Sequence, residues 1–511
     1  MAENSNVEAY SRSQVKKGTV ISYLALVINI LSGLIFTPWL IHQLGDSDYG
    51  IYSIGTSIIT LLIMDFGISE AVAKYVAQYR TEGKEDKIDN LISVVTKIYL
   101  LLAVVFLVIF VILYFFIGNI YVSLSPKELD KLRIVYVIVA VYNIFAFTFT
   151  PLSGIMLAYE HLVSLKLCDI ITRLATIAIT VIAIEFGMGL FSAVLANALA
   201  GIIVIAYKLF IVQRRHHFKL NLKYRNQELL KKILSFSVWV AVLIITQRCI
   251  YSITPSILGS LSGSSETTLY SISSTLEGYA YSFGSVICTM FLAKITRMLS
   301  ANDIKGFNEL MVYTGKIQFI LISMILVGFI CIGKDFIGIW MGDGYEITYY
   351  MTILLLLPNL FIWPFMTAGV GLTVISRVKE QALVNLGTAV INIAMECMLV
   401  GRFGAIGAVI SIAIANSFKG IALIFVYKKF LTINLKKFGW EIFGRYGGAS
   451  LVIAGVLIII TSKITLENVW GNFLSKSLIT VVLYVMFIMV VITVTDKSFL
   501  KKQNEIVGTK R

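Results

Sequence analysis

The chain has 511 residues, of which 58% are hydrophobic and only 14% are charged, and its formal net charge is +14. This composition excludes a soluble globular protein, because repeated apolar runs of about 20 residues are typical of transmembrane helices. The basic excess does not indicate nucleic-acid binding, since the Lys and Arg residues lie in short connections between the apolar runs.

Taken in chain order, the apolar runs predict fourteen transmembrane helices and no large soluble domain. The first seventeen residues are polar, so the first span is expected to target the chain to the membrane without a cleavable signal peptide. The predicted spans are 18–41, 49–76, 90–117, 134–158, 162–184, 188–212, 233–258, 267–292, 310–333, 347–375, 380–400, 405–427, 446–462 and 474–495.

Positive charge predicts the orientation of the spans. Most of the 43 Lys and Arg residues, including Lys16 and Lys428, fall on the side of the N-terminus. By the positive-inside rule both termini are cytoplasmic, which agrees with an even number of spans. The opposite side holds only Lys127, Lys131, Arg133, Lys334, Arg402, Lys463 and Lys476.

The sequence also repeats itself with a shift of 217 to 219 residues, although chance similarity among apolar helices is an alternative. Pro38 in the first span matches Pro255 in the seventh, and Asn197 in the sixth matches Asn416 in the twelfth. Six helices separate the copies, so both halves point the same way and form a parallel repeat. The fold is therefore expected to be all-α, with two parallel six-helix lobes and two C-terminal helices. The expected parts are a cytoplasmic tail (1–17), an N-lobe (18–212), a basic cytoplasmic linker (213–232), a C-lobe (233–430), the added helices (431–495) and a second cytoplasmic tail (496–511).

Charged residues at membrane depth are the candidates for a functional site. Asp65 lies near the middle of the span 49–76, and a carboxylate there is expected to face a bundle interior or a wet cavity. Arg248 lies near the middle of the seventh span, and its planar guanidinium suits a phosphate or a carboxylate. The alternative for Arg248 is a structural ion pair with Asp65 or Glu277. Lys419 either reaches the membrane interface or supplies a second cation.

Asp169 and Arg173 are four residues apart on one helix face and are expected to neutralise each other, although Arg173 can still present part of its guanidinium to a cavity. Asp65, Asp169 and Glu277 are the candidates for balancing charge or binding a coupling ion. Glu396 is expected to reach water at the outer end of its span. The four histidines have no metal-ligand spacing, so no metal site is expected, and the five cysteines form no CxxC pair and are expected to be reduced. The sequence has no nucleophile elbow, P-loop or zinc spacing, so no enzyme is expected.

Three segments, LGDSDYGIY (44–52), MDFGI (64–68) and AKYVA (73–77), resemble the first two helices of the polysaccharide-transport family, the Wzx-type flippases of the MOP superfamily. Fourteen spans, two parallel lobes and cytoplasmic termini extend the resemblance to that superfamily over nearly the whole chain. Many Wzx-type members are described with twelve spans, whereas lipid II flippases have an extra pair, so the last two spans depart from the Wzx pattern.

The resemblance implies a flippase in the cytoplasmic membrane of a bacterium. Such proteins move an undecaprenyl-pyrophosphate-linked oligosaccharide to the outer leaflet by alternating access through a cationic cavity, which here would contain Arg248, Arg173 and Lys419. The implied partners are this lipid, the bilayer and other polysaccharide-assembly proteins, and a monomer suffices. No cofactor is expected apart from a coupling ion, Na⁺ or H⁺. A MATE-type cation or drug antiporter, a lipid II flippase and a non-transporting scaffold remain alternatives.

Overall fold

The computed structural model describes residues 2–63, 65–215, 221, 223, 224, 226–375, 377–496 and 499, and the regular elements in this part of the chain are all helices. The chain divides into two compact units, unit 1 (Met1–Thr268) and unit 2 (Leu269–Arg511). The boundary falls near the start of one long helix. The lobe boundary expected at 213–232 stays a prediction.

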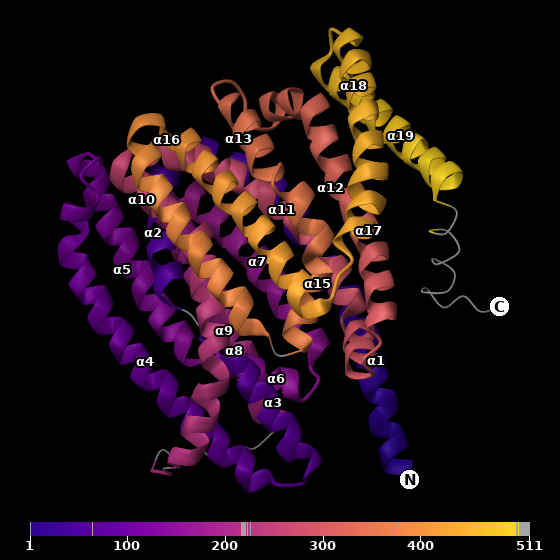
Figure 1. Cartoon of the computed structure of the whole chain (residues 1–511). Coiled ribbons are helices and arrows are strands. Elements are labelled where there is room, and N and C mark those ends of the chain that lie inside the picture. The colour runs from indigo at the N-terminus through magenta and orange to yellow at the C-terminus, as the bar shows by residue number, and fades with distance from the viewer. Residues whose placement is uncertain are drawn as a thin grey trace. The chain divides into compact units, whose positions relative to one another are not determined.

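Unit 1 contains the first ten helices and the start of the eleventh (Figure 1). A proline lies inside the first of them, Pro38, and does not interrupt it, whereas Pro151 and Pro255 lie where one helix ends and the next begins. The helices are α1 (Ala2–Leu44), α2 (Asp46–Leu62), α3 (Ile68–Thr81), α4 (Glu85–Ile120), α5 (Pro126–Thr148), α6 (Pro151–Ala158), α7 (Leu162–Glu185), α8 (Leu190–Arg215), α9 (Gln227–Tyr251), α10 (Thr254–Leu261) and α11 (Ser264–Ser300).

The core of unit 1 lies where α2 and α3 pack against α4, α5 and α6. Ile54, Tyr99 and Leu132, from three of these helices, are fully buried there. α5 begins with a complete capping box, in which the side chains of Ser125 and Glu128 each bond the backbone N–H of the other. The start of α5 is therefore fixed locally, and its position matters for the contacts described below.

Unit 2 contains the remaining helices. The expected span 347–375 is broken into short pieces, because Pro358 and Pro364 cannot donate the hydrogen bonds of a continuous helix. The helices are α12 (Ile304–Trp340), α13 (Ile347–Leu356), α14 (Asn359–Ile362), η1 (Trp363–Phe365), α15 (Met366–Val374), α16 (Val378–Leu431), α17 (Leu435–Gly439), η2 (Trp440–Gly447), α18 (Gly448–Lys463) and α19 (Val469–Thr495).

α16 is two helical legs joined by a tight reversal (Figure 1). Its 54 residues would measure about 81 Å as one straight helix, far more than a hydrocarbon core of about 30 Å. Gly404 has a φ of 55° and a ψ of −137°, which ordinary helical residues do not adopt. The legs approach so closely that a Cβ on Gly407 would lie 2.5 Å from the carbonyl oxygen of Leu399. The legs coincide with the expected spans 380–400 and 405–427.

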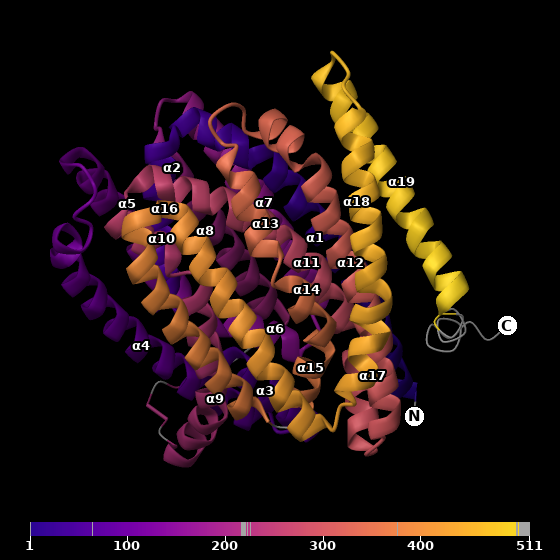
Figure 2. The ribbon, with the colours of Figure 1, turned by 45° about the horizontal axis from the view of Figure 1, so that its top comes forward.

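The two C-terminal helices α18 and α19 lie side by side in Figures 1 and 2 and pack on α12. Both carry large apolar side chains on their exposed faces, such as Leu451 (77% exposed) and Val494 (71% exposed). Exposed aliphatic surface of this extent marks a contact with lipid or with protein, and the segments Leu435–Lys463 and Val469–Thr495 are both long and apolar enough to cross a membrane. The C-terminal pair therefore belongs to the membrane part of unit 2.

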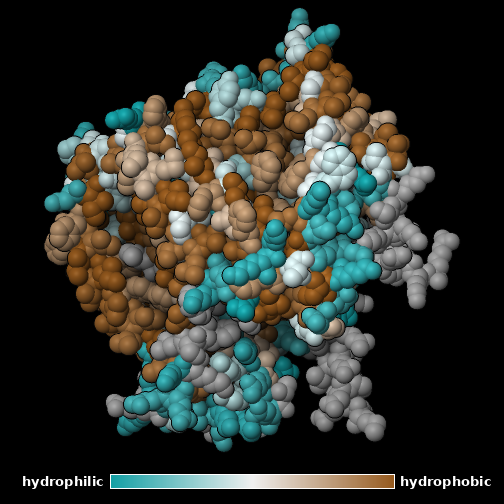
Figure 3. All heavy atoms as spheres, in the orientation of Figure 1, coloured by the Kyte–Doolittle hydropathy of each residue, from teal (hydrophilic) through white to brown (hydrophobic). Residues whose placement is uncertain are grey.

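Eleven helical segments among the described residues are long and apolar enough to cross a membrane. Figure 3 shows hydrophobic residues over much of the visible face, with hydrophilic ones gathered at its top and over its lower part. The expectation of an all-α, multi-span membrane protein is confirmed. The number fourteen stays a prediction, because α16 counts once among the eleven and the interrupted pair α2–α3 and α11 are not among them.

Candidate functional site

The helix expected over 49–76 is not continuous, so the expectation that Asp65 lies in the middle of a helix is wrong. α2 ends at Leu62 and α3 begins at Ile68. Phe66 and Gly67 between them have left-handed backbone, with φ of 52° and 71°. Gly adopts this conformation without strain, and a carboxylate shortly before a helix accepts bonds from its free N–H groups. The break between Leu62 and Ile68 could not be seen from hydropathy, because the run 49–76 is apolar over nearly its whole length.

Asp65 binds the start of α3 and one residue of α4. The backbone N–H of Ser69 donates to Oδ2 at 3.0 Å, and the Ser69 hydroxyl donates to Oδ1 at 3.1 Å. The hydroxyl of Tyr99, a fully buried residue, also donates to Oδ1. Three donors therefore hold the carboxylate in place without a cation. Its roles in balancing charge or binding a coupling ion stay predictions.

The expected pair of Asp169 and Arg173 is not formed. Asp169 is exposed and pairs with Lys166, with 3.0 Å between Nζ and Oδ2. Arg173 is half-buried, and its Nε donates to the Ser32 hydroxyl of α1 at 3.1 Å. Its charge also acts on Tyr52 of α2. Lys166 is three residues from Asp169 on the same helix face and therefore competes with Arg173 for the carboxylate.

Arg248 lies on α9, within the candidate membrane span Ala241–Leu261, and is half-buried. Its guanidinium makes no ion pair with any residue in the part of unit 1 that the structure describes. The proposed structural partner Asp65 instead accepts from Ser69 and Tyr99. A partly desolvated guanidinium with five donors and no carboxylate beside it is suited to bind an anion.

Glu277 of α11 and Lys419 of α16 lie near one another in unit 2. Their charges interact, and the side-chain amide of Asn359, at the start of α14, donates to Oε1 of Glu277 at 2.9 Å. Three helices therefore place an acid, a base and an amide together where the span 347–375 is broken. Lys419 does not need to reach the membrane interface to be stabilised, because Glu277 supplies the opposite charge.

The carboxylate of Glu396 on α16 is buried, contrary to the expectation from the sequence. Glu396 was expected to reach water, but it is fully buried and accepts a bond of 3.0 Å from the side-chain amide of Asn392. Thr388 and Asn385 are buried on the same leg. The spacing of Thr388, Asn392 and Glu396 at intervals of four residues places polar groups on one helix face, and this signal is present in the sequence.

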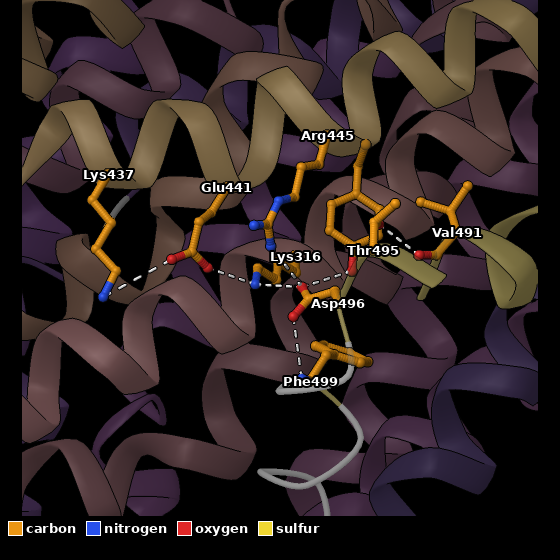
Figure 4. A network of polar contacts seen from close by, with 9 residues as sticks. Lys316, Lys437, Glu441, Arg445, Val491, Thr495, Asp496 and Phe499 are labelled. Atoms are coloured by element: carbon orange, nitrogen blue, oxygen red, sulfur yellow. Dashed lines mark hydrogen bonds and ion pairs between the residues drawn. The ribbon is translucent and has the colours of Figure 1, made fainter. Parts of the chain in front are cut away.

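A network of charged residues attaches the C-terminal helices to α12 (Figure 4). Lys316 of α12 is almost fully buried, and its Nζ lies 2.5 Å from Asp496 Oδ2 and 2.7 Å from Glu441 Oε2. Arg445 of η2 lies 3.9 Å from the same Asp496 oxygen. Sequence reasoning missed this network, because Lys316 and Asp496 are 180 residues apart and no local spacing links them.

The described residues contain no group of three or more His, Cys, Asp or Glu side chains that could hold a metal ion.

The site residues predicted from the sequence are divided between the two units. Unit 1 holds Asp65, Asp169, Arg173 and Arg248, and unit 2 brings Glu277 and Lys419 together. What the groups supply is positive charge and hydrogen bonding inside membrane helices, which suits binding and movement of an anion more than bond chemistry.

Comparisons with known proteins identify the family of this chain. The model of a family described as "Polysaccharide biosynthesis protein" matches residues 15–291, more than half of the chain. A putative O-antigen transporter of Shigella flexneri is 21% identical over 421 residues, which cover 82% of this chain and 98% of that protein.

Solved structures show the fold. A lipid II flippase MurJ in an inward closed conformation has a TM-score of 0.71 at 15% identity, covering 93% of this chain and 98% of that one. An inward-facing multidrug resistance MATE family transporter of the MOP superfamily has a TM-score of 0.68 at 13% identity, covering 82% and 99%. The expected resemblance to transporters of the MOP superfamily, and not to an enzyme, is confirmed at the level of the fold. The chain belongs to the polysaccharide biosynthesis protein family and is a multi-pass membrane protein with the fold of MOP-superfamily transporters.

Proposed function

We propose that this protein moves an undecaprenyl-pyrophosphate-linked oligosaccharide from the inner to the outer leaflet of a bacterial cytoplasmic membrane by alternating access. The observation that carries the proposal is Arg248, a half-buried guanidinium inside a candidate span with no ion pair in the described part of unit 1. Leaving a charge desolvated without a counterion is unfavourable, so an anionic ligand supplies the missing partner. The O-antigen transporter relative supports a saccharide cargo.

Two further cations assist in this proposal. Arg173 is half-buried, its Nε donates to the Ser32 hydroxyl, and its charge acts on Tyr52, so both of these neighbours among the described residues are neutral side chains. Lys419 is balanced by Glu277, so a pyrophosphate there competes with a carboxylate. Arg248 is therefore the primary anchor and the other two are helpers. Asp65, Asp169 and Glu277 balance charge or bind the coupling ion, Na⁺ or H⁺.

The arrangement in the membrane follows the sequence repeat. We place fourteen crossings in two parallel six-helix lobes with α18 and α19 as an added pair, and both termini in the cytoplasm. Counting the broken pair α2–α3 as one crossing, α11 as another and the legs of α16 as two raises the eleven candidate spans to fourteen. In this arrangement a monomer suffices, and other polysaccharide-assembly proteins are its partners.

The test is a deletion of the gene in its host, followed by assay of the leaflet in which undecaprenyl-linked oligosaccharide accumulates. Accumulation on the cytoplasmic side, rescued by the wild type, supports the proposal. Arg248→Ala is expected to lower export about ten- to a hundredfold, because hydrogen bonds to charged groups contribute about 1.5–3 kcal/mol. The matched control is Arg133→Ala, an exposed arginine outside the proposed site, which should rescue fully.

Two results contradict the proposal. Normal export in the deletion strain together with greater sensitivity to cationic drugs indicates a MATE-type antiporter instead, and accumulation of lipid II indicates a lipid II flippase. Full rescue by Arg248→Ala, with a functional wild type, removes Arg248 from the site while leaving the transport activity in place.

A further inference from the structure

Within unit 1, α10 and the residues beside it are joined to α2 and to the connection between α4 and α5. We name this contact region the α10 seam. It consists of seven hydrogen bonds. Four join a hydroxyl to a carbonyl oxygen: Ser57 to Ser252 (2.5 Å), Ser123 to Gly259 (2.7 Å), Ser260 to Ile120 (2.6 Å) and Thr268 to Asp46 (2.7 Å). The other three join the hydroxyls of Ser57 and Ser256 (3.1 Å) and the hydroxyls of Ser47 and Ser264 to the Glu128 carboxylate.

Glu128 is the hub of the α10 seam. Its Oε2 completes the capping box of α5 by accepting from the Ser125 backbone at 2.9 Å and from the Ser125 hydroxyl at 2.7 Å. Its Oε1 accepts from Ser47, at the start of α2, at 2.6 Å and from Ser264, at the start of α11. One carboxylate therefore ties three separate stretches of unit 1 together, and its orientation is fixed by the helix that it caps.

Two glycines make the close approach in the α10 seam possible. A Cβ on Gly50 of α2 would lie 2.0 Å from the Ser264 carbonyl oxygen, and one on Gly259 of α10 would lie 2.4 Å from the Ile54 side chain. No relaxation of a flexible side chain relieves the first contact, because it is with backbone. Any residue larger than glycine at position 50 is incompatible with the closed α10 seam.

The bonds of the α10 seam are of a kind that can break and form again. Most join a Ser or Thr hydroxyl to a carbonyl oxygen, each contributes about 0.5–1.5 kcal/mol, and water can replace either partner. A break between two helices lies directly beside them, because α9 ends at Tyr251 and α10 begins at Thr254 with Pro255 in its first turn. The α10 seam lies at the ends of helices whose connections carry few basic residues, the side expected to face outward.

We propose that the α10 seam is a latch on the outer side of the transporter, that Glu128 is the residue that positions it, and that it opens when the substrate path is exposed to the outside. This inference rests on the proposed alternating access. It assigns to Ser47, Ser264, Gly50 and Glu128 a role in the conformational cycle and none in binding the lipid-linked substrate.

The first test locks the latch. Ser47→Cys and Ser264→Cys are introduced together into a chain whose five native cysteines are replaced, since the two hydroxyls lie 3.4 Å apart. Oxidation is expected to form a disulfide and stop export of lipid-linked oligosaccharide, and reduction is expected to restore it. Each single cysteine variant is the control and should be insensitive to oxidation. Normal export by fully cross-linked protein overturns the proposal.

The second test needs neither cysteines nor a substrate. Hydrogen–deuterium exchange of residues 252–268 is measured in the full-length protein in lipid nanodiscs. Glu128→Gln and Gly50→Ala are expected to increase exchange in this segment severalfold, because both weaken the closed arrangement. The matched controls are Glu467→Gln, an exposed acid, and Gly455→Ala, where a Cβ meets nothing within 4 Å.

Unchanged exchange in both Glu128→Gln and Gly50→Ala overturns the proposed latch, whatever the protein transports. Faster exchange in these variants, together with no export of lipid-linked oligosaccharide by the wild type, supports the latch and refutes the proposed substrate. The two proposals can therefore fail separately.

Discussion

At the scale of residues, Asp65 and Arg248 are two charged side chains in predicted spans, and the residues around them differ: Asp65 has hydrogen-bond partners and Arg248 has no ion pair in the described part of unit 1. Asp65 accepts hydrogen bonds from Ser69 and Tyr99, so its charge is distributed over donors of the protein itself. Arg248 has no such partner in the described part of unit 1. A charged side chain with hydrogen-bond partners in the protein stabilises one arrangement of helices, whereas a charged side chain without them favours the binding of a ligand of opposite charge.

Removing the Tyr99 hydroxyl tests the first case. Tyr99→Phe is expected to destabilise the protein by about 2 kcal/mol, since a hydrogen bond to a carboxylate contributes about 1.5–3 kcal/mol. The control is Tyr136→Phe, which removes a bond to the carbonyl of Phe110, a neutral acceptor for which about 1 kcal/mol is expected. Thermal unfolding in detergent shows which of the two variants loses more stability. An equal or smaller loss for Tyr99→Phe contradicts a charged Asp65 in the folded protein.

The residues that carry charge could be identified from the sequence, but their partners could not. The spacing of Asp169 and Arg173 allows an ion pair, yet Lys166 is also within reach and forms it. Which cation pairs with a carboxylate depends on side-chain rotamers and on neighbouring helices, and the spacing of residues along one helix does not reveal either. Ser32 and Tyr99 are 141 and 34 residues from the side chains that they contact, which no periodicity indicates.

At the scale of elements, polar groups determine where the helices break and what holds them. The runs 162–184 and 188–212 agree closely with α7 and α8, whereas α11 and α12 extend well beyond the runs 267–292 and 310–333 because polar residues continue these helices. The interruption between α2 and α3 was missed, since the residues around Asp65 are apolar enough to continue a span. Its signal was the sequence Asp-Phe-Gly at 65–67, a carboxylate followed by a glycine, as at many helix boundaries.

The attachment of the C-terminal helices α17, α18 and α19 to α12 depends on the α12 residue Lys316. Lys316→Met leaves the fully buried Asp496 without its closest cation, and removal of one partner of a buried ion pair costs about 3–5 kcal/mol. Thermal unfolding in detergent is expected to show this loss. Adding Asp496→Leu to the same chain should restore part of it, because two apolar side chains do not leave a buried charge.

The control for this prediction is Lys305→Met at the start of α12, where the side chain is exposed and a change within about 0.5 kcal/mol is expected. If Lys316→Met is no more destabilising than Lys305→Met, the network in Figure 4 does not hold the C-terminal helices in place.

At the scale of the whole molecule, the fold class followed from apolar runs along the entire chain, whereas the family resemblance followed from short segments near its start. Repeated apolar runs gave the multi-span architecture, and the segments at 44–52 and 64–68 gave the resemblance that the family match confirms. The exact number of crossings depends on short interruptions such as Gly404, whose backbone conformation no apolar run reveals.

The fourteen-crossing arrangement predicts the sides of three positions on α16. Cysteines introduced at Lys379 and Lys429 should both react with an impermeant maleimide from the cytoplasmic side, and one at Arg402 only from the outside. The reason is that the chain reverses between the two legs and therefore returns to the side from which it came. Lys84→Cys and Lys127→Cys serve as inner and outer references. Labelling of positions 379 and 429 from opposite sides contradicts the arrangement.

The reversal in α16 also bears on how the chain is made. Its first leg carries Asn385, Asn392 and the buried Glu396, so it is a poor membrane segment by itself, and these groups are shielded only when neighbouring helices are present. Only a few residues separate the two legs, and Arg402 is the single charge between them. The legs therefore leave the ribosome almost together and are suited to enter the bilayer as one hairpin, with synthesis of the second leg completing the insertion of the first.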